Sequence, residues 1–169
     1  MSVAAAQMKL LLSAVVPSAS PLIGGPRVEV SIDNPPASGN TNGQWALATT
    51  LTYTIAASAT ESVDLKVIPG PSGADIAFVE VGAIAVLHEP ASVSSSVDLS
   101  PNATNGWTAI FQDASDLTRL LAGQAWVVLD YSGDGAGFAV GASSKVLDIV
   151  NNDGANAATV TLAVFGRSA

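Results

Sequence analysis

The feature that most constrains the fold is an alternation of large apolar residues with small or hydroxylated ones, with a period of two. It is clearest over residues 45–55, where the odd positions include Trp45, Leu51 and Ile55, and every even position is Ala or Thr. Successive residues of a β-strand point to opposite faces of its sheet, so this segment has one face for a core and one hydroxyl-rich outer face.

The same alternation recurs along the chain, in four further sets of apolar residues spaced two apart. These are Val28, Val30 and Ile32; Val63, Leu65 and Val67; Leu147 and Ile149; and Val160, Leu162 and Val164. Other expected strands are Lys9–Val16, Ile76–Glu80, Ala83–His88, Val93–Leu99, Trp107–Gln112, Gln124–Tyr131 and Gly137–Val140.

Ten to twelve short strands separated by turn residues predict an all-β fold, a jelly-roll-like β-sandwich with an extended N-terminal arm. All nine prolines lie before residue 102. The half of the chain after Pro101 is therefore the more regular one, and we expect the main sheet pairing there.

Residues 113–122 allow two interpretations. Ser115 is a suitable N-cap for a short helix that Gly123 would end. Alternatively, a turn leads into a strand over Leu117–Leu121, which is the interpretation we prefer.

The turn at Asn151–Gly154 ends in Asp-Gly, a pair that supplies the positive φ of a tight hairpin. It predicts that Lys145–Val150 and Ala157–Phe165 pair with each other as a C-terminal hairpin.

The first twenty residues have some features of a signal peptide. Lys9 precedes the apolar run Leu10–Val16, but that run is at the short limit for such a peptide. We therefore expect Gln7–Val16 to be a strand and the Pro-rich segment Pro17–Asn42 to be a long loop or an arm that lies on a neighbour. The predicted division is an arm over residues 1–42 and a sandwich domain over residues 43–169.

Charge and cysteine content exclude several classes of protein. With 14 acidic and 6 basic residues the net charge is −8, which disfavours both nucleic acid and anionic membranes as partners. The absence of cysteine removes thiol catalysis, Cys-ligated zinc and a disulfide framework. No run reaches the ~18 apolar residues that a bilayer span needs.

Charged residues make up 12% of the chain, half of the usual ~25%. Because charge is depleted at the centre of protein–protein interfaces, this shortage indicates that other subunits cover much of the surface. The alternative is a soluble, neutral, Ser/Thr-rich sandwich of the kind found in many secreted bacterial domains.

The single histidine is the first candidate for chemistry. His88 beside Glu89 could be a general base with its orienting carboxylate. A serine triad would also need a nucleophile elbow such as G-x-S-x-G, which the sequence lacks. We therefore interpret His88 as a strand-end residue near the turn-forming Pro90 and expect no catalytic residues.

Asp130, Ser132 and Asp134 space their oxygens as a Ca²⁺ loop does, but position twelve of that loop would be Gly141, which has no carboxylate. Residues 133–137 are glycine-rich but lack the G-K-[ST] ending of a phosphate loop. A Gly-rich turn is the preferred interpretation, and no metal or cofactor is expected. Asn102–Thr104 fits the glycosylation sequon, a pattern that is common by chance.

Three tryptophans could form a platform for sugar rings. Trp45 and Trp126 fall on apolar strand positions and are interpreted as core, whereas Trp107, after Asn105-Gly106, is the one most expected to be exposed. A carbohydrate- or cell-surface-binding module that uses Trp107 and the acidic turn Asp130–Asp134 is therefore the alternative function.

The C-terminal block Ser144–Ala169 resembles the end of small β-rich virion proteins of tailed bacteriophages. In those proteins a K-x-L-x-I-x-N strand, an Asn/Gly turn and a T-V-x-L-x-V-x-G strand close the chain, and residues 118–124 also look similar. The resemblance implies a head decoration (cement) protein, a homotrimer seated on the outer capsid lattice.

The expected function is thus structural and non-enzymatic: bridging neighbouring capsid subunits on the capsid exterior, after a stage in the host cytoplasm during assembly. The partners would be the major capsid protein and further copies of the chain, with residues 1–42 as the contact. Repeated weak contacts over a symmetric lattice would supply avidity. A small hydrolase that uses His88 is a third and weaker option.

Overall fold

The structure is a computed structural model that describes residues 9–13, 27–31, 47–130 and 137–168. No helix in these ranges is long and apolar enough to cross a membrane. The described strands are β1 (Lys9–Ser13), β2 (Arg27–Ser31), β3 (Leu47–Ile55), β4 (Thr60–Asp64), β5 (Ile68–Pro69), β6 (Asp75–Ile76), β7 (Phe78–His88), β8 (Ser96–Pro101), β9 (Thr118–Leu121), β10 (Ala125–Leu129), β11 (Phe138–Ala139), β12 (Val146–Asn151) and β13 (Ala158–Ser168).

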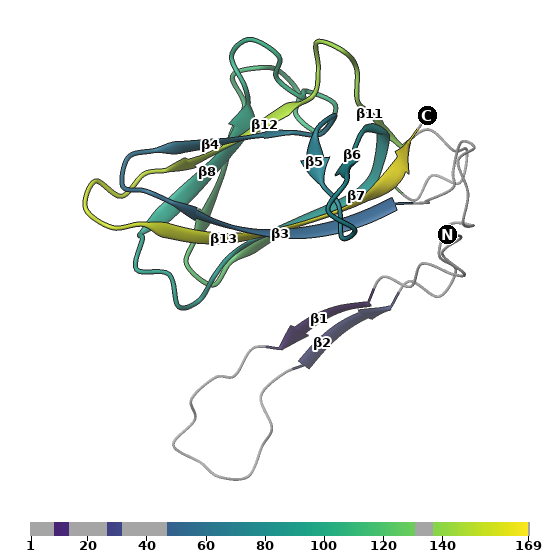
Figure 1. The fold of residues 1–169 in the computed structure, drawn as a ribbon. Coiled ribbons are helices and arrows are strands. Elements are labelled where there is room, and N and C mark those ends of the chain that lie inside the picture. The colour runs from purple at the N-terminus through teal and green to yellow at the C-terminus, as the bar shows by residue number, and fades with distance from the viewer. Residues whose placement is uncertain (1–8, 14–26, 32–46, 131–136, 169) are drawn as a thin grey trace.

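Two antiparallel sheets stack face to face (Figure 1). The first sheet has the strand order β10-β7-β13-β3, with β11 beside one end of β7. The second has the order β4-β12-β8-β9, and the short β5–β6 ribbon lies near one end of the sandwich. The molecule is therefore an all-β sandwich, as the alternation predicts.

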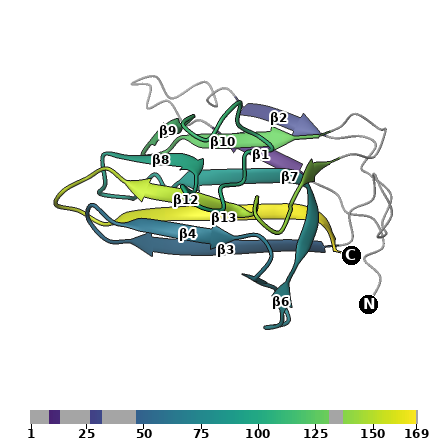
Figure 2. The same ribbon diagram turned by 90° about the horizontal axis from the view of Figure 1, so that it is seen from above.

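The order of the eight principal strands is that of a jelly roll. These eight strands are, in chain order, β3, β4, β7, β8, β9, β10, β12 and β13. The first sheet then contains strands one, eight, three and six of this series, and the second sheet contains strands two, seven, four and five. Every connection except β8–β9 crosses from one sheet to the other, as in two interleaved Greek keys. Figure 2 shows strands of the two layers lying over one another from above.

The predicted C-terminal hairpin is wrong. β12 pairs with β4 and β8, whereas β13 pairs with β3 and β7 in the other sheet. The segment Asn151–Gly154 therefore leads from one sheet to the other and is not a tight turn within one sheet. The side chain of Asn151 is buried and bonds to carbonyl groups at the start of the β3–β4 connection, which holds the segment in this position. The expectation that the half after Pro101 pairs mainly with itself is also wrong, since β12 and β13 each lie between strands from the earlier half.

Of the other local predictions, one is confirmed and two are wrong. The preferred strand over Leu117–Leu121 is confirmed as β9, and Gly123, with φ of 83°, forms the turn after it. The strand expected over Trp107–Gln112 is wrong, because this segment forms successive turns. Val67 is not on the core face: the chain turns back as its N–H bonds to the carbonyl of Asp64, leaving Val67 57% exposed.

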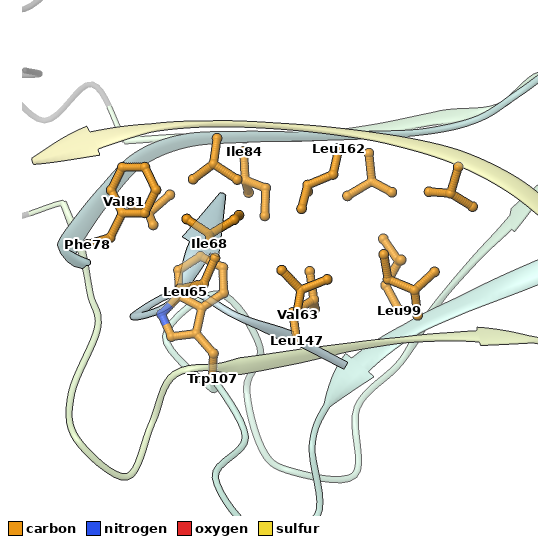
Figure 3. Packing of buried hydrophobic residues seen from close by; sticks show 14 of the residues in the cluster. Val63, Leu65, Ile68, Phe78, Val81, Ile84, Leu99, Trp107, Leu147 and Leu162 are labelled. Carbon is orange, nitrogen blue, oxygen red and sulfur yellow. The ribbon is translucent and has the colours of Figure 1, made fainter. Parts of the chain in front are cut away.

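The core lies between the sheets (Figure 3). Ile84 and Leu162 face it from the first sheet, while Leu99 and Leu147 face it from the second; none of the four has exposed surface. Each such side chain contributes about 1.5–3 kcal/mol by leaving water. Trp107 closes one end of this core from its irregular segment and is also fully buried.

The N-terminal hairpin is the remaining described element. β1 pairs antiparallel with β2, and Figure 1 shows the pair outside the sandwich. The strand expected at Gln7–Val16 is thereby confirmed over Lys9–Ser13. Most of the Pro-rich segment Pro17–Asn42 and the N-terminal part of the expected arm lie outside the described residues.

Candidate interaction surface

The outer face of the first sheet carries no charged side chain over three cross-strand rows. Alternation places the core residues of each strand on one side, so the residues between them face outward. Row by row from β10 to β3, the outward residues are Leu129, Ala83, Phe165 and Ala48; Val127, Ala85, Ala163 and Thr50; and Ala125, Leu87, Thr161 and Thr52. We call these twelve residues the uncharged face.

Two observations confirm this orientation. The hydroxyls of Thr52 and Thr161 lie 3.1 Å apart across neighbouring strands, so both side chains stand on one side of the sheet. Trp126 and Val128, the residues between the outward ones of β10, pack instead against the core. The uncharged face is thus a property of four strands that are far apart in the sequence.

The size of the uncharged face follows from sheet geometry. Four strands about 4.8 Å apart and rows about 6.8 Å apart span about 14 Å in each direction between Cα atoms, or on the order of 400 Å² with side chains. Ala83 is fully buried and seven of the twelve residues are only partly exposed, so the area open to a partner is smaller than this. A standard protein–protein interface buries about 800 Å² per partner. The uncharged face alone would therefore support a weak contact, which repetition or a second contact has to strengthen.

The outer face of the second sheet is different, because it collects carboxylates. Asp64, Asp98 and Asp148 stand at its outward positions together with Arg119. Arg119 holds Asp98 through two parallel bonds, Nε to Oδ1 at 2.7 Å and Nη2 to Oδ2 at 2.8 Å. Hydrogen bonding to Arg119 lowers the pKa of Asp98, so this carboxylate stays ionised well into acid. The two outer faces of one sandwich thus differ sharply in charge.

The cations of the sandwich are largely engaged in ion pairs. Besides the Arg119 pair, Lys145 Nζ lies 2.7 Å from Asp64 Oδ2, and Arg167 Nε lies 2.8 Å from Glu80 Oε2. These pairs hold loop and strand ends in place. They leave no cluster of described cations that would suit a polyanion.

His88 is held as a structural residue. It is fully buried at the end of β7. Its Nδ1 donates to the carbonyl oxygen of Leu120 at 3.2 Å, because a carbonyl can only accept. In the neutral ring the other nitrogen, Nε2, then accepts from the Ser92 hydroxyl at 3.0 Å. Ser92 Oγ in turn accepts the backbone N–H groups of Ser94 and Thr159. Both ring nitrogens are therefore used to tie β7, β9 and β13 together, as the interpretation of a strand-end histidine requires.

The structure differs from the sequence-based expectation at the tryptophan that was the best candidate for exposure. Trp107, expected to be exposed, is fully buried; its Nε1 donates to the carbonyl of Ala139 at 2.9 Å, and its ring meets Phe138 edge-on. Trp126, expected in the core, is half-buried and packs against the core, and its ring stacks on Phe111 with centroids 5.8 Å apart. Trp45 lies outside the described residues.

The other candidate motifs lie mostly outside the described residues. The sequence considered as a Ca²⁺ loop, 130–135, and the glycine-rich segment 133–137 share residues 131–136 as their undescribed part. In the described ranges no three carboxylates, histidines or cysteines gather closely enough to hold a metal ion. Asn102 of the sequon donates its side-chain amide to both oxygens of Asp148, at 3.1 and 3.0 Å, so that amide is used by the fold.

The sequence signals this surface only in part. The small even-numbered residues of 45–55 correctly indicate an uncharged outer side for β3. The outward residues of β7 and β10 could not be recognised, because Ala83–Leu87 and Val127–Leu129 are apolar at every position, and a continuous apolar run does not say which side faces the core.

No protein-family model and no curated protein matches this chain. Solved structures with some likeness include a chain from Bacillus endospore appendages, described as disulfide-linked pili (TM-score 0.39, 11% identity, 79% of this chain and 98% of that one). Others are the Yersinia pseudotuberculosis-derived mitogen (0.37, 14%, 72% and 87%) and a chain of tomato aspermy virus (0.41, 16%, 83% and 88%). These scores are too low to support an argument about function.

Proposed function

We propose that this protein is a non-enzymatic structural component of a tailed-phage virion that decorates the capsid exterior and bridges neighbouring capsid subunits. The observation that carries the proposal is the uncharged face, which a solitary acidic protein has no reason to keep free of charge over four strands. The resemblance of Ser144–Ala169 to phage virion proteins supports a phage capsid as the assembly that this protein joins.

The size of the uncharged face suits a protein that binds many equivalent sites on a capsid lattice. A patch on the order of 400 Å² supports only a weak single contact, but copies that bind several sites at once gain effective affinity without any stronger contact. The exterior is the favoured side of the shell, because a net charge of −8 opposes contact with packaged DNA. The major capsid protein and further copies of the chain are the proposed partners, with a trimer as the proposed unit.

The test is co-sedimentation of the purified protein with expanded capsids that were assembled without it. Two matched variants place the same new charge on opposite faces: Thr50→Lys on the uncharged face and Thr60→Lys on the outer side of the second sheet. Both positions are exposed threonines on edge strands, and both changes move the net charge from −8 to −7. Ala163→Lys, next to Thr50, is a more central and more severe version of the first.

We expect the wild-type protein and Thr60→Lys to co-sediment alike, and Thr50→Lys to bind at least tenfold more weakly, because an unpaired ammonium group is costly to bury. If wild-type protein stays in the supernatant, or if both threonine variants lose binding equally, the proposed function is wrong.

A carbohydrate-binding role is the second candidate, but the residue it mainly relied on, Trp107, is inside the core. What remains is the half-buried stack of Phe111 and Trp126. Binding to a glycan array that Trp126→Ala abolishes, by a protein that ignores capsids, would establish this role in place of the first.

A further inference from the structure

We propose that the free edge of β3 pairs with the same edge of a second copy of the chain, antiparallel and about a two-fold axis. The first sheet of each copy then continues into that of the other. The inference goes beyond the proposed function, because it needs only the strand edge and no capsid. Its two-fold symmetry separates it from the contacts within the proposed trimer, so on a lattice it joins subunits of adjacent trimers.

The direction of the backbone groups on β3 follows from the neighbouring strands. The N–H of Glu89 donates to the carbonyl oxygen of Thr159 at 2.9 Å, so the backbone groups of Thr159 face β7. Successive residues of a strand direct these groups to opposite sides. Those of Val160 therefore face β3, where its partner is Tyr53. Tyr53 and every second residue from it bond to β13, and the residues between them direct their backbone groups to the free edge: Ala48, Thr50, Thr52 and Thr54.

Most of this edge is open. In the described part of the chain no hydrogen bond reaches the outward backbone groups of Thr50, Thr52 or Thr54, and all three side chains are exposed. At the N-terminal end of β3 the β5–β6 ribbon lies against the strand, since the hydroxyl of Thr49 donates to a carbonyl oxygen of the ribbon at 2.6 Å. Figure 2 shows β6 beside this end of β3. The open part of the edge therefore begins at Thr50.

β3 also lacks the features by which natural proteins block an exposed strand edge: charged side chains, proline, bulges and short length. Its nine residues, Leu47–Ile55, include no charge and no proline, and its register with β13 runs without a shift. The other edge strands of the two sheets have four or five residues, and two of them carry charge, with Glu61 and Asp64 in β4 and Arg119 in β9. A long, unprotected edge is a template for a further strand.

A second copy supplies an edge that matches this one. In an antiparallel pair, residues that direct their backbone groups outward must lie opposite each other. A two-fold axis through Thr52 achieves this for the whole open part, because Thr52 then lies opposite its own copy and Thr50 lies opposite Thr54. All outward groups of these residues are paired, in about six hydrogen bonds.

The side chains that face each other in this arrangement are also compatible. Every outward pair is Thr with Thr, a combination that interacts favourably across strands and has no charge to repel its own copy. A contact of this kind already joins β3 to β13 within one copy, where the hydroxyls of Thr52 and Thr161 lie 3.1 Å apart. The edge of β3 thus suits a second β3 as its partner.

The chain has no natural cysteine, so single-cysteine variants test both the pairing and its register. Full-length Thr50→Cys, Thr52→Cys and Thr54→Cys proteins are mildly oxidised, each alone and the first and last also as an equal mixture. Disulfide-linked dimers are followed on a non-reducing gel. About 1 M salt screens the repulsion between two copies of net charge −8. The three positions are exposed threonines of one strand, so they are controls for one another.

We expect Thr52→Cys alone, and the mixture of Thr50→Cys with Thr54→Cys, to cross-link at least tenfold faster than Thr50→Cys alone or Thr54→Cys alone. Opposite residues are about 5.5 Å apart between Cα atoms, which a disulfide can bridge. Thr50 of one copy lies instead about 14 Å from Thr50 of the other, because the two are four residues out of register. A disulfide cannot span that distance.

Sedimentation of the cysteine-free protein in the same salt gives an independent measurement. Thr52→Pro removes an N–H that faces the free edge, so the ladder with β13 stays intact while a partner strand is blocked. Thr52→Val keeps this N–H, and both variants lose the hydroxyl contact with Thr161. We expect Thr52→Pro to raise the dissociation constant between copies at least tenfold and Thr52→Val to change it less than threefold. Native far-UV circular dichroism of both variants is the control for folding.

Three results would overturn the inference: equal cross-linking rates for all samples, a fastest product from one of the single variants expected to be slow, or no difference in association between Thr52→Pro and Thr52→Val. No capsid is present in these experiments. Edge pairing that is observed while co-sedimentation with capsids fails therefore refutes the proposed function alone, and the opposite pair of results refutes edge pairing alone.

Discussion

Replacing Asn151, the last residue of β12, by alanine should destabilise the sandwich more than any single change at a polar residue of the β12–β13 connection that follows it. Its side chain is 1% exposed and lies where the chain passes from one sheet to the other. Nδ2 donates to the carbonyl oxygens of Ile55, Ala56 and Asn156 at 3.2, 3.0 and 2.8 Å. Oδ1 accepts from Ser94 Oγ at 2.7 Å and from the backbone N–H of residue 153 at 3.0 Å.

The magnitude follows from these partners. One amide group supplies two donor hydrogens and accepts two bonds, so about four hydrogen bonds are lost at once, each with a net value of about 1 kcal/mol. Water can reach some of the groups left behind near the surface, which reduces the sum. We therefore expect a loss of about 3 kcal/mol in the free energy of unfolding, a large part of the 5–15 kcal/mol typical of a domain.

Urea denaturation followed by tryptophan fluorescence measures this loss. With a slope of about 2 kcal/mol per molar urea, 3 kcal/mol lowers the midpoint by about 1.5 M. The matched control is Asn156→Ala in the same connection, an exposed residue whose backbone carbonyl still accepts from Asn151. It should cost under about 0.5 kcal/mol. If the two variants unfold within about 0.5 M of each other, the buried amide does not join the two sheets as argued.

Three further predictions test the core and the charges. Trp107→Phe removes the indole donor to the carbonyl of Ala139 and part of a fully buried ring, and should cost about 1–2 kcal/mol in the same urea assay, with native far-UV circular dichroism retained. Because the folded-state pKa of Asp98 is lowered by Arg119, its contribution to stability is present above the ordinary Asp pKa and is lost as the pH falls through the lowered value; Asp98→Asn should flatten this acid dependence of stability. Burial raises the pKa of Tyr53 to about 12, so its stabilising effect is lost as the pH rises from about 10 through 12, and an absorbance titration should lose a late-titrating phenol in Tyr53→Phe.

Local periodicity identified most strands, but it did not identify their partners. Leu147 and Ile149 were correctly expected to face the core, as were Val160 and Leu162. The hairpin between these two segments was wrong because an Asp-Gly pair permits a tight turn without requiring one. The path of this segment is set by the buried Asn151 amide, which requires carbonyl partners. The residues that supply them, where β3 leads into the β3–β4 connection, are nearly a hundred positions away in the sequence.

The unexpected burial of Trp107 has a related cause. Trp107 follows Asn105-Gly106, which indicates a turn, and turns are usually on the surface. Here the turn lies across the open end of the sandwich, because the N–H of Trp107 and the bridge at Gly106 both attach to Val146. A side chain in an irregular segment can therefore complete the core when its backbone is bonded to a central strand, and only the three-dimensional path reveals it.

The apolar runs of β7 and β10 connect the fold to the proposed assembly. A strand that is buried on one side alone can place polar residues on its other side, as β3 does with Thr50 and Thr52. β7 instead carries Ala83, Ala85 and Leu87 on its outer side, which is the pattern of a strand covered on both sides. The core accounts for one of these sides. The outer side of the second sheet carries Asp64, Asp98 and Asp148, which have no counterpart among the outward residues of β7. The matched variants Thr50→Lys and Thr60→Lys test directly whether a partner covers this second side of the first sheet.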